Sequence, residues 1–154
     1  PANGKIRSLD ASSASKIVSE VMLKADKFSI EASSAARIET AVEATSCTIE
    51  TSSASKVEAS VEAGSCSLDA SSASKITLEG SARTFKADMS SASKLNAEKF
   101  SAVNATIDTS SAANVSIDCS GKLTASASSG SSIRYSGDCQ TSLEKSSGGS
   151  IRKL

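Results

Sequence analysis

The sequence lacks several residue types on which catalysis and ordinary globular cores depend. Its 154 residues include no His, no Trp, one Pro and few aromatic side chains, three Phe and one Tyr. Without His, nucleophile activation by Ser-His or Cys-His pairs is excluded. The cysteines at 47, 66, 119 and 139 match no C-x-x-C spacing, and no His is present to complete a mixed zinc site. We therefore expect no catalytic residues, no cofactor and no metal site.

An excess of charge of either sign is also missing. Seventeen Lys and Arg balance seventeen Asp and Glu, so the formal net charge at pH 7 is zero, and no nucleic-acid partner is expected. No apolar run approaches the roughly 20 residues that span a bilayer, so no membrane insertion of this segment is expected. The opening PANGKIRS has neither an initiator Met nor a basic-then-apolar signal, which indicates a mature or trimmed product.

The sequence is rich in serine, and it repeats. It contains 37 Ser, and the phrase LDASSASKI at residues 9–17 returns unchanged at 68–76. A Ser-Ser-Ala or Ser-Ser-Gly corner recurs in steps of 21, 19, 19, 19, 20, 18 and 18 residues, which predicts seven full coils of about 19 residues with partial coils at the ends. The first Ser of each corner is Ser12, Ser33, Ser52, Ser71, Ser90, Ser110, Ser128 and Ser146.

Apolar and polar residues alternate around each corner. Aliphatic columns lie three residues before and five residues after the first corner Ser, and polar residues intervene, as in FSIEA and CTIET. Period two is typical of strands, whereas a helix requires a period of 3.6. We therefore predict an all-β parallel β-helix, with two or three short strands in each coil and with equivalent residues of successive coils stacked.

A column of small residues lies two positions after the first corner Ser. A narrow bend admits only small side chains, so this column is expected to point inward, and Ala73→Leu is expected to overpack the corner at a cost of about 1–3 kcal/mol. The column consists of Ala14, Ala35, Ala54, Ala73, Ala92, Ala112, Gly130 and Gly148.

The four cysteines fall into two pairs. Cys47 and Cys66 occupy one inward column on adjacent coils, where buried thiols acting as small hydrophobes are favoured over a strained disulfide. Cys119 and Cys139 lie nearer turns and are the better candidates for a disulfide.

Two outward columns are charged and form the candidate surface. Like charges at strand spacing repel, and the neighbouring column of opposite sign is expected to offset this, each exposed pair contributing only about 0–1 kcal/mol. A solvated, self-neutralising face is favoured. The sharper alternative is that the acidic column binds calcium or docks on a glycan or crystalline surface, although one carboxylate per coil makes a poor calcium cage. The acidic column is Asp10, Glu31, Glu50, Asp69, Asp88 and Asp108, and the basic column is Lys16, Arg37, Lys56, Lys75 and Lys94.

The repeated phrases also carry a family resemblance. The succession SLDASSASKI, SIEASSAARI and TIETSSASKV, closing with SSGSSIRYSGD and SLEKSSGGSIRKL, resembles the head GIN domain of putative auto-transporter adhesins (DUF2807), a bacterial domain of unknown function. The similarity covers residues 1–154, which are thus expected to form one β-helix repeat domain. The resemblance implies a single-stranded, right-handed β-helix in the cell envelope of Bacteroidetes, periplasmic or extracellular, secreted or lipoprotein-anchored. Members often carry more sequence ahead of the repeats, so an N-terminal part of the full-length protein is expected to be missing.

Two classes of function are open. The first is a non-enzymatic structural or adhesin-like module of the envelope, with a glycan or an envelope protein as partner. The alternative is a carbohydrate-binding or carbohydrate-active β-helix protein, which should show exposed aromatics or acidic residues that break the repeat; only Tyr135 stands out, and the acids obey the repeat. Uncapped terminal coils expose strand edges, which predicts an end-to-end homodimer.

Overall fold

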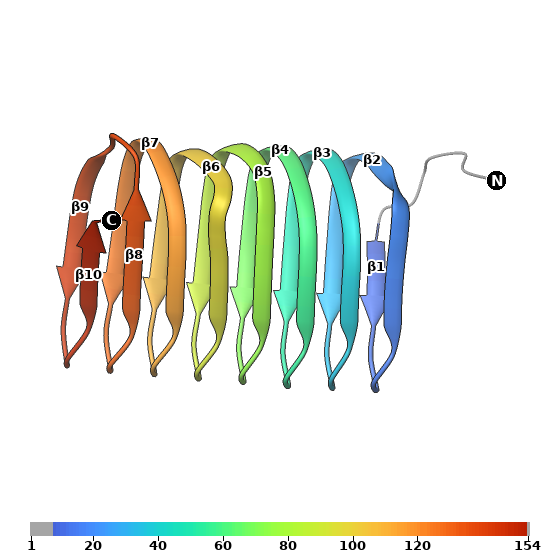
Figure 1. The fold of residues 1–154 in the computed structure, drawn as a ribbon, viewed down its shortest axis with the longest axis horizontal. Coiled ribbons are helices and arrows are strands. Elements are labelled where there is room, and N and C mark those ends of the chain that lie inside the picture. Colours follow the sequence, from blue (N-terminus) through green and yellow to red (C-terminus); the bar gives the residue numbers. More distant parts are fainter. Residues whose placement is uncertain (1–7, 154) are drawn as a thin grey trace.

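Each full coil of the protein is one long strand, and successive coils pair in parallel (Figure 1). The computed structural model describes residues 8–153. Every strand of that range belongs to one sheet, in which β1 to β8 follow one another, β10 pairs with β8, and β9 pairs with β7. The strands are β1 (Ser8–Ala11), β2 (Lys16–Ala32), β3 (Arg37–Thr51), β4 (Lys56–Ala70), β5 (Lys75–Met89), β6 (Lys94–Thr109), β7 (Asn114–Ala127), β8 (Ser132–Ser136), β9 (Gln140–Lys145) and β10 (Ser150–Lys153).

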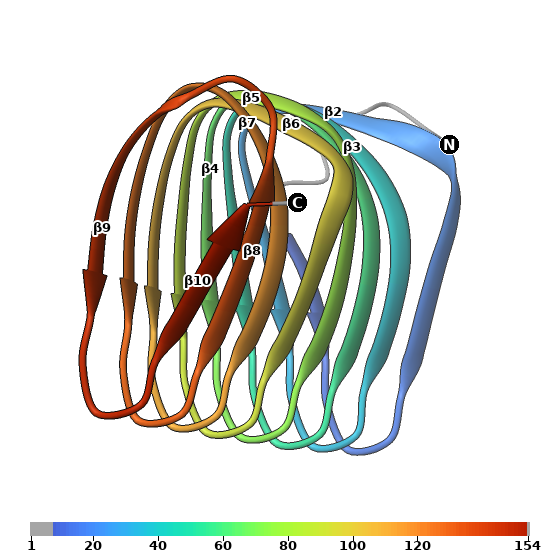
Figure 2. The ribbon, with the colours of Figure 1, turned by 60° about the vertical axis from the view of Figure 1, so that its left-hand side comes forward.

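The predicted parallel β-helix of about 19 residues per coil is confirmed. The division of each coil into two or three short strands was wrong, because β2 to β7 each run without interruption for 14 to 17 residues. Figure 2 shows the C-terminal end toward the viewer, and the chain rises through β8, passes over the top and descends through β9 as it advances. This path is right-handed. The described residues contain no helix that could span a membrane.

The aliphatic columns form the core as predicted. Ile38, Val57 and Ile76 stack in register on β3, β4 and β5, and none of them is exposed to solvent. The rings of Phe85 and Phe100 pack inside the coil with centroids 5.2 Å apart. The columns become exposed only toward the ends of the stack, where no further coil covers them.

Two consecutive residues with left-handed backbone make each tight turn. Ser72 and Ala73 have φ values of 58° and 65°, and the equivalent residues of the other seven turns also have positive φ. A non-glycine residue in this conformation costs about 1–2 kcal/mol. Hydrogen bonds between stacked turns offset this cost, since the Ala73 N–H donates to the Ser91 carbonyl oxygen at 2.9 Å and the same bond recurs along the stack.

The small column therefore points outward, and the expectation that it fills the bend was wrong. Ala73 and all its equivalents are exposed at the tips of the turns. The buried positions of the turn are the residue before the first corner Ser and the residue three after it, such as Ala70 and Ser74. Small residues occur at the tip because of the backbone conformation, and Gly130 and Gly148 take the left-handed position at the last two turns.

Differences in coil length are absorbed away from the tight turns. The pairing shifts register between Val18 and Met22 in β2, between Thr77 and Glu79 in β5, and between Ala97 and Ser101 in β6. In each case the first three or more residues after the turn are paired before the shift begins, and the residues before the next turn are paired again. The register of the sheet is also visible as the regular stack of coils in Figure 1. The residues that flank the turns consequently keep their register along the stack.

We expect Ala73→Gly to raise the free energy of unfolding by about 0.5–1 kcal/mol, because glycine accepts the left-handed backbone and only part of this gain is lost to its freedom in the unfolded chain. Ala70→Leu, at the inward position of the same turn, should lower it by about 1–3 kcal/mol. Urea unfolding followed by circular dichroism measures both. Destabilisation by the glycine, or tolerance of the leucine, would contradict the assigned directions.

Candidate functional site

Six carboxylates stack in register on one face of the solenoid. Asp10 lies beside Glu31, Glu31 beside Glu50, and the series continues coil by coil, with every side chain exposed. Adjacent strands lie about 4.8 Å apart, so the carboxylates form a closely spaced row. This acidic ladder consists of Asp10, Glu31, Glu50, Asp69, Asp88 and Asp108.

Serine hydroxyls join the middle of the acidic ladder in a shallow groove of about 310 Å³. The sequence analysis used these serines only to mark the corners and did not assign them to the site. Their position two residues after each carboxylate was the available signal, because alternate residues of a strand share a face. The acidic groove is lined by Glu31, Glu50 and Asp69, by Ser33, Ser52 and Ser71, and by Ala32 and Thr51.

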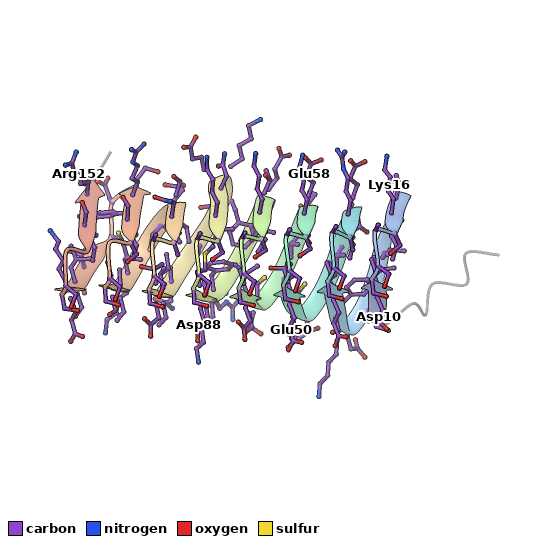
Figure 3. All side chains as sticks on the ribbon, turned by 90° about the horizontal axis from the view of Figure 1, so that it is seen from below. Asp10, Lys16, Glu50, Glu58, Asp88 and Arg152 are labelled. Carbon is purple, nitrogen blue, oxygen red and sulfur yellow. The ribbon has the colours of Figure 1, made fainter. Side chains whose placement is uncertain are left out.

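The basic ladder lies on the opposite side of the turns. Its members Lys16, Arg37, Lys56, Lys75 and Lys94 also stack in register. In Figure 3, which looks toward the turns, Lys16 projects away from the side on which Asp10, Glu50 and Asp88 lie. The expected neutralisation of one ladder by the other was therefore wrong, and no ion pair among residues 8–153 joins them. The tight turn reverses the chain between the two columns and places them on different faces.

Two glutamates that lie on the same face as the basic ladder form ion pairs with it. The Arg37 guanidinium lies 2.6 Å from Glu39 Oε1, and Lys56 Nζ lies 2.8 Å from Glu58 Oε1. Arg37 also approaches Glu58 at 3.8 Å. The hydrogen bond from Lys56 holds the pKa of the Glu58 carboxyl below its usual value, and the nearby positive charge of Arg37 acts in the same direction. The period of two along the strand brings each glutamate beside the cation two residues before it.

The acidic ladder has no such partners. None of its six carboxylates takes part in an ion pair among the described residues. Within the same range, no three Cys, Asp or Glu side chains gather closely enough to hold a metal ion. The arrangement can accept hydrogen bonds from a ligand that carries hydroxyl groups, and its negative charge attracts cations along the row.

The four aromatic side chains of the chain are all in the interior. Phe28, Phe85 and Phe100 are at most 2 % exposed, and Tyr135, the single aromatic that the sequence analysis singled out, is 9 % exposed. A surface on which sugar rings stack against aromatic side chains is therefore absent from this chain. Any carbohydrate ligand would have to be bound through polar groups.

Family comparison agrees with the architecture. The family described as putative auto-transporter adhesin, head GIN domain, matches residues 3–139. The chain belongs to this family. No curated protein matches the sequence of this head GIN domain.

Three solved structures share the fold of this head GIN domain. A putative adhesin from Parabacteroides distasonis superposes with a TM-score of 0.93 at 15% identity, over 97% of this chain and 64% of that one. A putative adhesin from Parabacteroides merdae gives 0.89 at 17%, over 96% and 63%. A putative lipid binding protein from P. distasonis gives 0.78 at 18%, over 97% and 62%. Such identities show the fold alone, and the chain spans less than two thirds of each of these proteins.

We expect Lys56→Gln to raise the pKa of the Glu58 carboxyl toward its ordinary value, because it removes the main hydrogen bond that lowers it. A carboxyl with a lowered folded-state pKa stabilises the protein above its ordinary pKa, and the contribution is lost as the pH falls through the folded-state value. Carbon-detected NMR titration of the side-chain carboxyl measures the change. Lys86→Gln on the other face is the matched control, and an equal shift in both variants would contradict the assignment.

Proposed function

We propose that this head GIN domain is a non-enzymatic, adhesin-like module of the cell envelope that docks on glycans through the acidic groove. The observation that carries the proposal is the row of six in-register carboxylates that have no ion-pair partner among residues 8–153 and lie beside serine hydroxyls. Carboxylates accept hydrogen bonds from sugar hydroxyls, and serines both donate and accept them.

The difference between the two faces supports this proposal. The basic ladder is partly compensated on its own face by Glu39 and Glu58, whereas the acidic ladder keeps its like charges about one strand spacing apart. Neighbouring charges at such distances repel by about 1 kcal/mol in water, before screening by salt. A bound cation, or a ligand hydroxyl group that donates a hydrogen bond, reduces this repulsion. The repulsion in the free ladder therefore favours ligand binding.

The family assignment supports an extracellular or envelope-associated location, because the family is described as an adhesin. We extend this to a periplasmic or extracellular site in the envelope, with either a secreted or a lipoprotein-anchored form. A glycan, rather than an envelope protein, is the preferred partner because the acidic groove presents only carboxylate and hydroxyl groups as polar side chains. The name of the lipid binding relative describes that protein, and the polar side chains that line the acidic groove here are carboxylates and hydroxyls.

A carbohydrate-active enzyme is the less favoured alternative. Glycoside hydrolysis usually requires a pair of carboxylates whose environments differ, so that one acts as an acid and the other as a base or nucleophile. The acidic ladder repeats one environment in coil after coil, and each of its members is exposed. The buried aromatic side chains also leave no stacking platform for a polysaccharide.

An end-to-end homodimer is a second part of the proposal. Every residue of β9 is exposed, and Leu143, which belongs to an inward column, is 36 % exposed. Association at this edge would pair free backbone groups and cover Leu143. We expect static light scattering to give twice the mass of the chain at high concentration. In the Leu143→Lys variant the mass measured at the same concentration should be lower. A monomer at every concentration would contradict this.

We expect the triple variant Glu50→Lys, Asp69→Lys and Asp88→Lys to lose glycan binding by more than tenfold, because it reverses the charge at the centre of the acidic ladder. A glycan array followed by calorimetry, with and without calcium, measures the loss. The matched control is Lys56→Glu, Lys75→Glu and Lys94→Glu on the opposite face, which should bind as the unaltered chain does. No binding by the unaltered chain, or equal loss in both variants, would refute the acidic groove as a recognition surface.

A further inference from the structure

The face that carries the basic ladder changes its chemistry along the stack. In β3 and β4 the cation directly after the turn forms an ion pair with a glutamate two residues further on. From β6 onward the same two columns contain no acidic residue, so the cations there lack such a partner. The first column continues as Lys94, Asn114, Ser132 and Ser150, and the second continues as Asn96, Ser116, Arg134 and Arg152.

Two arginines are neighbours at the C-terminal end of this face. Arg134 of β8 and Arg152 of β10 lie in register, one strand spacing of about 4.8 Å apart. Both side chains are exposed, and neither forms an ion pair within residues 8–153. Arg152 projects to the same side of the solenoid as Lys16 and Glu58 (Figure 3). Two guanidinium groups at this spacing repel each other, and an oxyanion that binds both of them reduces the repulsion.

Arg134 also lines a groove of about 340 Å³ that crosses β6, β7 and β8. Most polar side chains of this groove can donate hydrogen bonds, since they are two cations, two amides and two hydroxyls. Asn96 Oδ1 accepts a hydrogen bond from the Glu98 N–H at 3.3 Å, which leaves the amide NH₂ of Asn96 to donate to a ligand. This cationic groove is lined by Lys94, Asn96, Glu98, Asn114, Val115, Ser116, Ser132 and Arg134.

Two carboxylates, Glu98 and Asp118, lie on the same part of the face. Asp118 accepts a hydrogen bond from the Ser136 hydroxyl at 3.0 Å. Neither carboxylate forms an ion pair in the part of the chain that the structure describes. Glu98 can accept hydrogen bonds from ligand hydroxyls, and its charge disfavours a ligand with densely packed negative groups. The cationic groove therefore suits a ligand that combines separated oxyanions with hydroxyl groups.

We propose that the cationic groove, together with Arg152, binds a linear polysaccharide that carries carboxylate groups. A planar guanidinium binds a carboxylate through two parallel hydrogen bonds, and Arg134 and Arg152 present two such groups side by side. Lys94, two strands away, attracts a second carboxylate, and the amides and hydroxyls between them bind ring hydroxyls. The site lies on the face opposite the acidic ladder, so the inference goes beyond the proposed function and does not rest on it.

The form of the cationic groove favours a polysaccharide over an anionic membrane. A bilayer presents its phosphates on a broad surface, and binding to that surface gains strength from apolar side chains that enter it. The large apolar side chains that are exposed in residues 8–153 are Val18, Val103 and Leu143, and none of them lines the groove. A linear chain, in contrast, can lie along a groove that crosses three coils.

The test is calorimetric titration of the domain with oligogalacturonate, a linear carboxylated saccharide, in calcium-free buffer. We expect binding that weakens as sodium chloride is added, because salt screens exposed charges. The double variant Arg134→Gln and Arg152→Gln should bind roughly tenfold or more weakly, since it lacks both guanidinium groups. Both side chains are exposed, so circular dichroism should show an unchanged fold.

The matched control is Arg37→Gln with Lys56→Gln, which also removes two cations from this face. These cations already pair with glutamates, so the affinity should change by less than about threefold. In the unaltered chain, oligogalacturonate should shift the backbone amide NMR signals of β6, β7, β8 and β10, and this measurement needs no variant.

No binding of oligogalacturonate, amide shifts confined to other strands, or an equal loss of affinity in the two double variants would overturn the proposal. Tighter binding of dextran sulfate at equal charge would overturn the choice of carboxylate. Tighter binding of vesicles that contain phosphatidylglycerol, lost in the Arg134→Gln and Arg152→Gln variant, would identify a membrane site instead. That variant should keep any glycan binding at the acidic groove, so the two proposals can fail separately.

Discussion

The hydrogen-bonded register between successive coils is the constraint on which the rest of the structure depends. Ile38 lies over Val57 and Glu50 over Asp69, so whatever one coil places inside or outside is repeated by the next. Parallel pairing satisfies the backbone between coils and leaves no coil stable by itself. The same constraint therefore produces both the aliphatic core and the charged ladders. A core column and a surface ladder are two outcomes of one register, separated by a single step along the strand.

The left-handed turn adds a second constraint, because it divides the surface into two chemically different faces. The chain reverses within four residues, so the acid before the turn and the cation after it point to opposite sides (Figure 3). Two of the cations after the turn, Arg37 and Lys56, form ion pairs with the glutamates two residues further on. Three of the acids before the turn share a shallow groove with serine side chains instead. The acidic ladder consequently forms no ion pair among the described residues, although the net charge of the chain is zero and Lys86 lies on the same face.

Much of the fold could be predicted from the sequence, because period two and a repeat near 19 residues are both visible in the order of residues. The direction in which the small column points could not be predicted, because a crowded bend and a left-handed turn tip both favour Ala or Gly. The structure places Ala73 at the tip. The acidic and basic ladders could be recognised in the sequence. Their positions on different faces could not, because the turn geometry decides which columns share a face. Ser52 was read as a marker of the corner, although its spacing from Glu50 already placed it in the groove.

The uniformity of the acidic ladder limits the kind of ligand that suits it. Each coil offers one exposed carboxylate beside one serine, and a single such contact in water contributes little. Several identical contacts at the strand spacing add together only for a ligand whose own groups repeat along a line, and the later contacts then form at high effective concentration. A small molecule would touch one or two coils and gain little from the others. The fold therefore favours extended, periodic ligands over compact ones, and affinity should grow with the number of coils that the ligand spans.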